Sequence, residues 1–299
     1  MKITDLLQKK TILTNKDINI RDPFVIYENG TYYMYGTRAK NFGQKTGGFD
    51  VYTSTDLENW SAPHECFDSK KHSLNHMVNW APEVHKYKDK YYMFATFTRK
   101  NNNLRGTFIL SSDSPLGPFE PHSKGVVTPE DWECLDGTLY INPEGKPYIV
   151  FCHEHTQIID GTICYAPLSD DLTESTGEAV TMFKASEPYW ADEQKGDEHR
   201  ITDGPFMYRT KEGTLLMLWS TFIKEKYAEC LVRFPDGDLG MNFEHLPPLI
   251  DNDGGHGMIF KGEDKLYLTY HSPNQTDFER PCFIEIEDAG KEIRIKTKS

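Results

Sequence analysis

Residues 20–37 read Ile20-Arg-Asp-Pro-Phe-Val-Ile-Tyr-Glu-Asn-Gly-Thr-Tyr-Tyr-Met-Tyr-Gly-Thr37. Two runs rich in aromatic and β-branched residues flank the pair Asn29-Gly30. This pattern predicts a β-hairpin, because both residues of the turn that matches strand twist need positive φ. One acid, Asp22, opens the first predicted strand. We therefore expect Asp22 to lie at one end of a hairpin.

The same unit recurs along the chain. A second copy begins at Trp80-Ala-Pro-Glu83 and continues, like the first, into Tyr-Tyr-Met followed by an aromatic residue. Three further copies open with Leu135-Asp136-Gly137, Thr202-Asp203-Gly204 and Gly255-His256-Gly257. Each copy is followed by more strand-like sequence, and a spacing of roughly fifty to seventy residues is typical of propeller blades.

These repeats predict an all-β fold, a five-bladed β-propeller that forms a single domain over residues 1–299. The blades are expected to open near residues 22, 83, 136, 203 and 256. A β-sandwich is the competing all-β architecture, but it does not explain why each unit begins in the same way.

Composition limits the partners that the protein could have. A net charge of -13 argues against a nucleic-acid or anionic membrane surface as partner. The six cysteines include no Cys-x-x-Cys pair, so no zinc or thioredoxin-type motif is predicted. The sequence has no run of eighteen apolar residues and no apolar segment of a secretion signal. We expect a cytoplasmic protein that does not enter a membrane, and the sequence predicts no oligomeric state.

Residues at the same end of successive innermost strands of a propeller converge on one pocket. We therefore expect the five openings to face one another, namely Asp22, Glu83, Asp136, Asp203 and His256. Any one of these acids could simply cap a turn. Several carboxyls in one cavity raise one another's pKa at a cost in stability, which points to a function.

Two kinds of site fit such a cluster. Glycoside hydrolysis needs one protonated acid and one ionised carboxylate. A metal site is the alternative, because oxygen ligands suit Ca²⁺ and histidine with carboxylates suits transition metals. Aromatic residues near the openings favour a sugar substrate, although each could instead belong to the core; they are Trp80, Tyr140, Phe206 and Trp219.

At these motifs the sequence resembles glycoside hydrolase family 43, and the resemblance extends over nearly the whole chain. It implies a five-bladed propeller that cleaves α-L-arabinofuranosidic or β-D-xylosidic bonds with inversion. Arg21-Asp22-Pro23 is similar to the motif that carries the general base, and Asp136 to the acid that tunes and orients the proton donor. Trp80-Ala-Pro-Glu83 resembles a motif that lines the sugar pocket. The apparent lack of an export signal suggests short oligosaccharides as substrates.

The resemblance gives His256 a place on the propeller axis, in a Gly-His-Gly segment. A neutral His256 would there hold a water molecule or a Ca²⁺ ion. No cofactor is expected to be required. A phosphorolytic or β-fructosidase-like propeller is a weaker rival, because phosphate needs a basic cluster and the openings provide only Arg21.

The sequence departs from the family pattern at Asp203, where the family usually has a glutamate as general acid. The shorter side chain withdraws the carboxyl, and a misplacement near 1 Å can cost about a hundredfold in rate. Three interpretations stay open. Asp203 is the acid with its backbone shifted inward, or Asp203 binds substrate while Glu187 delivers the proton, or the protein binds sugar without hydrolysing it. Glu187 could itself belong to a surface turn.

Overall fold

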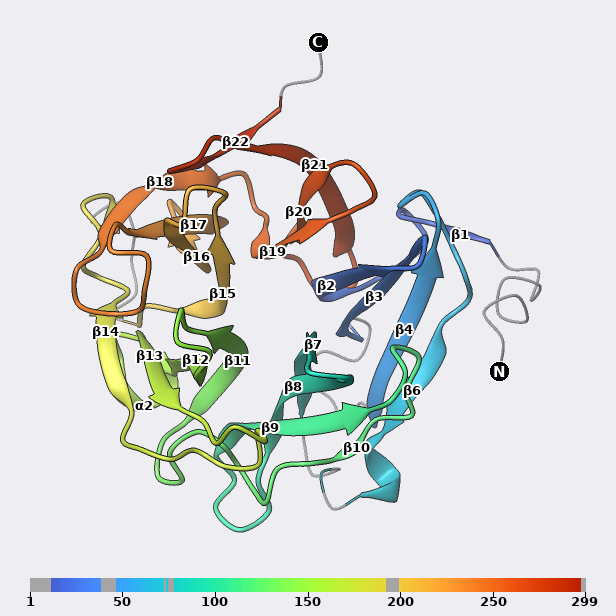
Figure 1. Cartoon of the computed structure of the whole chain (residues 1–299), viewed down its shortest axis with the longest axis horizontal. Coiled ribbons are helices and arrows are strands. Elements are labelled where there is room, and N and C mark those ends of the chain that lie inside the picture. The colour runs from blue at the N-terminus through green and yellow to red at the C-terminus, as the bar shows by residue number, and fades with distance from the viewer. Residues whose placement is uncertain (1–11, 39–46, 73, 75–77, 192–198, 297–299) are drawn as a thin grey trace.

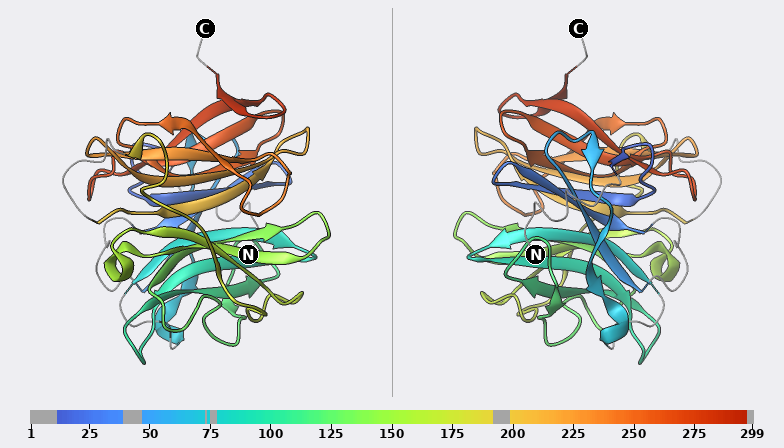
Figure 2. Two further views of the ribbon diagram at one scale, coloured as in Figure 1. Left: turned by 90° about the vertical axis from the view of Figure 1, so that its left-hand side faces the viewer. Right: turned by 90° about the vertical axis from the view of Figure 1, so that its right-hand side faces the viewer.

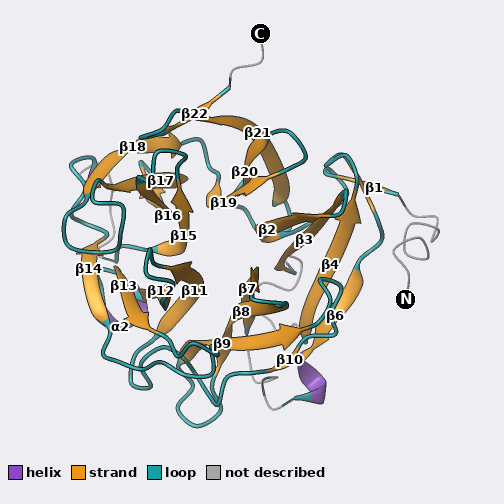
Figure 3. Cartoon of the chain, viewed as in Figure 1, coloured by secondary structure: helices purple, strands orange, loops and turns teal. Residues whose placement is uncertain are grey.

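The computed structural model describes residues 12–38, 47–72, 74, 78–191 and 199–296. Five antiparallel sheets surround a central axis, which confirms the all-β propeller (Figure 1). The helical elements within the described residues include the single turns η2 (Ser69–Lys71) and α2 (His155–Ile158) (Figure 3). No helix in this part of the chain has the length and apolar character needed to cross a bilayer. The predicted domain also includes residues 1–11 and 297–299, which lie outside the described residues.

Each blade is built from strands that are contiguous in sequence. Blade one contains β1 (Leu13–Thr14), β2 (Arg21–Glu28), β3 (Thr31–Thr37), β4 (Gly48–Ser54), β5 (Asn59–Trp60) and β6 (His64–Asp68). Blade two contains β7 (Asn79–Tyr87), β8 (Lys90–Thr98), β9 (Arg105–Ser112) and β10 (Glu120–Pro121). Blade three contains β11 (Cys134–Ile141), β12 (Pro147–His153), β13 (Thr162–Pro167) and β14 (Val180–Lys184). Blade four contains β15 (Asp203–Arg209), β16 (Leu215–Ile223), β17 (Lys226–Phe234) and β18 (Glu244–Ile250). Blade five contains β19 (Gly255–Lys261), β20 (Leu266–Ser272), β21 (Arg280–Asp288) and β22 (Ile293–Ile295).

The first hairpin forms as the sequence predicts. Glu28 pairs with Thr31, so Asn29 and Gly30 make a two-residue loop with φ of 50° and 78°. Positive φ at both positions gives the turn the twist of the flanking strands. The innermost strands β2, β7, β11, β15 and β19 line the axis, as Figure 1 shows.

The hydrophobic core lies between the blades. Apolar clusters join blade one to blade two, blade two to blade three, blade three to blade four, and blades four and five to blade one. The side views show the sheets packed against one another around the ring (Figure 2). Between blades five and one, Glu279 accepts hydrogen bonds from Asn19 and pairs with Arg21 at 3.1 Å. This packing holds the starts of the five innermost strands in a fixed ring.

Candidate active site

A β-bulge interrupts the pairing near the start of each innermost strand. In every blade the register with the second strand shifts across the same two residues. The first residue of each bulge has φ between 44° and 55°, the left-handed conformation that the first residue of a G1 bulge adopts. These residues are Asp22, Ala81, Asp136, Gly204 and His256. The bulge therefore gives the same backbone conformation to an equivalent position of each blade.

The bulges correct the predicted alignment of the five openings. Asp22, Asp136 and His256 occupy the equivalent position, as expected. Asp203 lies one residue before the bulge of its blade, and Glu83 lies two residues after Ala81. The sequence repeats could not give this offset, because it depends on which residue leaves the strand ladder.

Side chains of the preceding blade fix the bulges by accepting hydrogen bonds from the bulge amides. The amide of Asp136 donates to Oγ1 of Thr96 at 2.9 Å, and that of Asp22 donates to Nδ1 of His271 at 3.2 Å. The corresponding bonds in the other blades join Ala81 to Thr37, and His256 to Ser220. The amide of Gly204 donates instead to Oδ2 of Asp136 at 3.1 Å, so blade three holds blade four through a carboxyl.

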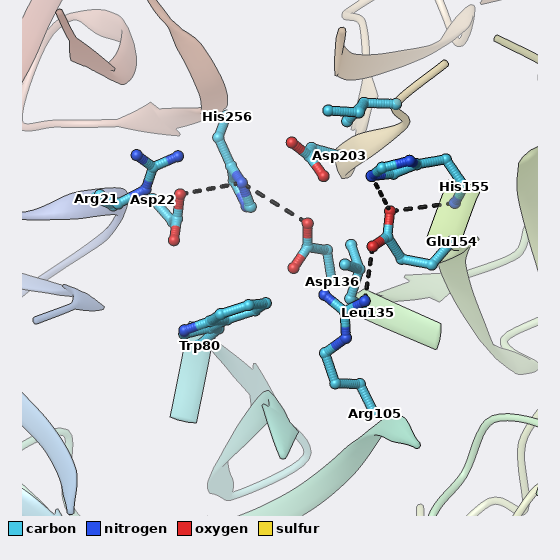
Figure 4. A pocket seen from close by; sticks show the side chains of 11 residues that line it. Arg21, Asp22, Trp80, Arg105, Leu135, Asp136, Glu154, His155, Asp203 and His256 are labelled. Atoms are coloured by element: carbon cyan, nitrogen blue, oxygen red, sulfur yellow. Dashed lines mark hydrogen bonds and ion pairs between the residues drawn. The ribbon is translucent and has the colours of Figure 1, made fainter. Parts of the chain in front are cut away.

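A cavity of about 160 Å³ lies where the starts of the innermost strands meet (Figure 4). Its walls bring together six of the predicted site residues, namely Arg21, Asp22, Trp80, Asp136, Asp203 and His256. Five further residues complete the walls: Arg105, Leu135, Glu154, His155 and Ile201. The predicted convergence of blade openings on one pocket is thus observed for four of the five titratable residues.

His256 lies between two carboxyls. Its Nδ1 atom is 3.1 Å from Oδ1 of Asp22 and 3.8 Å from Oδ2 of Asp136. Burial acts to lower the pKa of His256, but the charges of Asp22 and Asp136 outweigh burial and raise that pKa to about 9. His256 therefore carries a positive charge at neutral pH. This corrects the expectation of a neutral histidine.

Asp22 is ionised. Burial acts to raise its pKa, but the neighbouring charges, His256 first, outweigh burial and leave the pKa below its usual value. Thr37 donates a hydrogen bond to Oδ2 of Asp22 at 2.6 Å, which further favours the carboxylate. The cavity thus contains a carboxylate that can accept a proton near neutral pH.

The pKa values of Asp136 and Asp203 are raised, in contrast to that of Asp22. Burial, assisted by the negative charge of Asp203, raises the pKa of Asp136 to about 8. Burial, assisted by the charge of Glu154, raises the pKa of Asp203 to about 6. The hydroxyl of Tyr227 donates to Oδ2 of Asp203 at 2.9 Å. The two acids interact strongly, so they titrate as a pair that retains a proton near neutral pH.

Arg105 and Glu154 form a wall that the sequence analysis missed. Nη2 of Arg105 lies 2.7 Å from Oε2 of Glu154, and the guanidinium also pairs with Glu133 and lies 5.3 Å from the centre of the Trp80 ring. The strand order within a blade could have identified both residues from the sequence. In an antiparallel blade the end of the second strand and the start of the third meet at the end where the first strand begins, and Glu154 and Arg105 occupy those places.

The two arginines on the cavity wall do not form a phosphate-binding site. Arg21 pairs with Glu279, and Arg105 pairs with Glu133 and Glu154, so carboxylates neutralise both guanidinium groups. The charges of the cavity walls therefore give the phosphorolytic rival no support.

Two predicted acids lie away from the cavity walls. Glu83 is buried, and its Oε2 is 3.0 Å from Nε2 of His85. Glu187 is exposed in the turn after β14, where it accepts a hydrogen bond from the amide of Lys184 at 3.0 Å. Glu187 therefore has the role of a turn-capping side chain, and the idea that it delivers the proton is not supported by its position.

Three of the four predicted sugar-binding aromatics belong to the core. Trp219 is fully buried and stacks on Trp190 at 5.8 Å. Phe206 packs edge-on against Phe24, and the hydroxyl of Tyr140 donates to Asp238 at 2.6 Å. All three belong to apolar clusters that lie between blades. Of the four aromatics, Trp80 alone lies on the cavity wall.

The residues around His256 do not make a ready metal site. Among the described residues, no three histidine, cysteine, aspartate or glutamate side chains converge as a ligand set. Nδ1 of His256 is engaged with Asp22 and Asp136, so ligation of a cation by this atom would require the loss of its proton and of these contacts. The described side chains thus supply no set of direct protein ligands around His256, and a Ca²⁺ ion or water molecule beside it stays a prediction.

Comparison with known families decides the affiliation of the chain. A model described as glycosyl hydrolases family 43 matches residues 16–287. The chain belongs to glycosyl hydrolase family 43. The family resemblance seen at the blade openings is thereby confirmed, and so is the expectation that this is a member of a family of glycosidases.

Three named proteins are similar to this family 43 chain. The crystal structure of an endo-arabinase from Bacteroides thetaiotaomicron VPI-5482 matches with a TM-score of 0.83 and 36% identity, covering 94% of this chain and 99% of that one. The extracellular exo-alpha-(1->5)-L-arabinofuranosidase ArbA of Cellvibrio japonicus (strain Ueda107) is 21% identical, over 65% of this chain and 56% of its own. The extracellular endo-alpha-(1->5)-L-arabinanase 1 of Bacillus subtilis (strain 168) is 22% identical, over 44% and 42% respectively.

The family 43 chain spans about half the length of the curated relatives that it matches. Both of those proteins are named as extracellular. The cytoplasmic location predicted for this chain stays a prediction.

Proposed function

We propose that this family 43 protein hydrolyses α-L-arabinofuranosidic bonds in short oligosaccharides with inversion at the anomeric carbon, with β-D-xylosidic bonds as the second substrate class. One observation carries the proposal: Asp22, Asp136 and Asp203 line a single cavity, where neighbouring charges lower the pKa of Asp22 and burial raises the pKa of Asp136 and Asp203. An inverting glycosidase needs this combination of one carboxylate and one carboxylic acid. The arabinose-directed names of the relatives favour arabinofuranosides.

The reaction divides between the two sides of the cavity. Asp22 accepts a proton from water as the water oxygen bonds to the anomeric carbon. Asp203 gives its proton to the leaving oxygen as the bond between that oxygen and the anomeric carbon breaks. Asp136, which accepts the amide hydrogen bond of Gly204, holds the strand start on which Asp203 lies. His256, charged and 3.1 Å from Asp22, keeps the base ionised before the substrate binds.

Trp80 provides the flat surface for the sugar. Its ring lies on the cavity wall with the Arg105 guanidinium near it. An aromatic face of this kind packs against the apolar face of a furanose or pyranose ring. Ca²⁺ or a water molecule on the axis is not needed for any of these steps.

The stereochemistry of the first product tests the mechanism. Proton NMR during the first turnovers of an arabino-oligosaccharide should show the β-anomer of arabinose before mutarotation. A first product with the α-configuration would contradict inversion. We expect about 6.5–9.5 Å between the base and acid carboxyls, the separation of inverting enzymes.

A screen of 4-nitrophenyl glycosides should find hydrolysis of the α-L-arabinofuranoside or the β-D-xyloside by the wild type. Asp22→Asn should lower kcat/KM by about 10²–10⁴-fold, the usual contribution of a general base. Equal activity of Asp22→Asn and wild type would contradict the role of Asp22.

A carbohydrate-binding propeller with weakened turnover is the second candidate. The observation in its favour is the short acid, because Asp203 stands where the family resemblance implies glutamate and its Oδ2 is held by Tyr227. Calorimetric binding of arabino-oligosaccharides without any reducing-sugar release would favour this candidate over the enzyme.

A further inference from the structure

Glu154 is a buried carboxylate on the same cavity as the proposed catalytic acids, and none of the steps above uses it. It follows β12 from blade three, and its side chain accepts a hydrogen bond from the amide of His155 at the start of α2. The side chain is 5% exposed. Burying an ionised carboxylate costs free energy unless the charge is paired and hydrogen-bonded.

Arg105 supplies the partner and fixes the position of Glu154. Its Nη2 atom lies 2.7 Å from Oε2 of Glu154, and its Nε atom donates to Glu133. Glu133 thus anchors Arg105 from outside the cavity, whereas Glu154 reaches the cavity wall. The ion pair keeps a negative charge at a defined place on that wall.

Glu154 lies on the same side of the cavity as Asp203, opposite Arg21 and Asp22 (Figure 4). Tyr227 donates its hydroxyl hydrogen to Oδ2 of Asp203, so Oδ1 is the oxygen that can carry the transferable proton. The Tyr227 hydroxyl and the Glu154 carboxylate therefore act on the same acid in different ways. One selects the protonated oxygen, and the other sets how firmly the proton is held.

We propose that Glu154, held by Arg105, is a positioning residue whose negative charge keeps the proton on Asp203 until the leaving oxygen accepts it. The inference rests on the proposed function. Glu154 itself neither gains nor loses a proton: the proton passes from Asp203 to the leaving oxygen, and the water proton passes to Asp22. This device lets an aspartate serve as the acid where the family resemblance implies a glutamate.

The charges around Asp203 agree with this role. After burial, Glu154 makes the largest contribution that raises the pKa of Asp203 to about 6. Among the remaining groups, His256 and Tyr227 act to lower the pKa and Asp22 acts to raise it, while Asp136 titrates together with Asp203. Glu154 is thus the neighbour whose removal most favours early loss of the proton.

The test compares Glu154→Gln with Glu133→Gln. Both variants remove one carboxylate from Arg105, but only Glu154 lies on the cavity wall. The pH dependence of kcat is measured with arabinobiose, whose poor leaving group needs the proton, and with 4-nitrophenyl α-L-arabinofuranoside, whose leaving group needs it much less. We expect the descending limb for arabinobiose to move to lower pH in Glu154→Gln, with about a 3- to 10-fold loss at pH 7.

The loss with the 4-nitrophenyl substrate should be smaller, and Glu133→Gln should keep the limb in place. A limb that does not move in Glu154→Gln, or an equal loss with both substrates, overturns the inference. His155→Lys gives a second test with Glu154 intact, because a fixed positive charge beside Glu154 should move the limb in the same direction. An unmoved limb in His155→Lys would likewise overturn it. Failure of the proposed function would look different, because the wild type itself would then hydrolyse neither substrate.

Discussion

Nδ1 of His256 lies 3.1 Å from Oδ1 of Asp22, and this contact joins the last blade of the ring to the first. The pair places a positive charge beside the proposed base. It also explains how several carboxyls can share one small cavity, because the imidazolium offsets part of their repulsion.

Replacing His256 by glutamine should move the ascending limb of the pH dependence of kcat/KM to higher pH. Burial alone raises the pKa of Asp22, and the His256 charge is the first of the effects that lower it. Without that charge, Asp22 accepts a proton from solvent at a higher pH and loses its function as base. His155→Gln is the control, a second cavity histidine that does not contact Asp22. An ascending limb that stays in place would contradict the role of His256.

Replacing Asp203 by asparagine should stabilise the protein at neutral pH while abolishing hydrolysis of arabinobiose. The unfolded aspartate loses its proton near its usual pKa of 3.8, whereas the folded one retains it to about 6. Stability contributed by this retained proton is therefore present below pH 3.8 and is lost as the pH rises through 6. The uncharged amide of the Asp203→Asn variant would not suffer this loss, and Tyr227 could still donate to the side-chain oxygen.

We expect a gain of roughly 3 kcal/mol in the free energy of unfolding at pH 7.5 and little gain at pH 3.5. Urea unfolding of wild type and Asp203→Asn at the two pH values measures this difference. A variant less stable than the wild type at pH 7.5 would show that the Asp203 carboxylate does not lower the free energy of unfolding.

The two tryptophans that the sequence grouped together should respond differently to alanine. Trp80→Ala should raise KM by about 3- to 10-fold through lost contact with the sugar, with a modest effect on stability. Trp219 is fully buried, so Trp219→Ala should lower the free energy of unfolding by about 3–5 kcal/mol and leave KM of the folded fraction unchanged. Thermal unfolding and Michaelis–Menten kinetics on both variants separate the two roles. A KM effect confined to Trp219→Ala would reverse the assignment.

Gly204→Ala should damage the site more than its backbone strain alone accounts for. A Cβ atom at Gly204 would lie 2.6 Å from Cδ2 of His256, and its φ is +51°. Gly213 also has positive φ, +88°, but a Cβ there meets nothing within 4 Å. Gly213→Ala is therefore the control for backbone strain, which costs about 1–2 kcal/mol. We expect kcat to fall in Gly204→Ala only, because the His256 ring must move.

Much of the fold could be predicted from the sequence, since the hairpin of residues 20–37 and its repeats carry local signals of turn and strand. The site could be predicted in part. Asp22, Asp136 and His256 were found because each opens a visible repeat. Asp203 also lies on the cavity wall, although it precedes the bulge of its blade by one residue.

Other residues could not be assigned for physical reasons. The core position of Trp219 depends on which face of β16 meets blade three, and a fully buried strand carries no alternation that reveals its faces. Arg105 and Glu154 lie on second and third strands, where no repeat draws attention to them. The positive charge of His256 depends on how close two carboxyls lie to its ring. The Gly-His-Gly motif does not reveal those distances.

Ala81 shows what the repeated bulge permits. It adopts the same left-handed backbone as Asp22, Asp136 and His256 although its methyl group carries no chemistry, and Thr37 of the neighbouring blade holds its amide at 2.7 Å. The backbone of each bulge is thus secured independently of the side chain that it presents. In blades one, two and five a substitution at the bulge therefore leaves the acceptor of the bulge amide in place, whereas a substitution of Asp136 would remove the acceptor of the Gly204 amide. A propeller of this design can thus acquire a new chemistry at three of its blades one at a time.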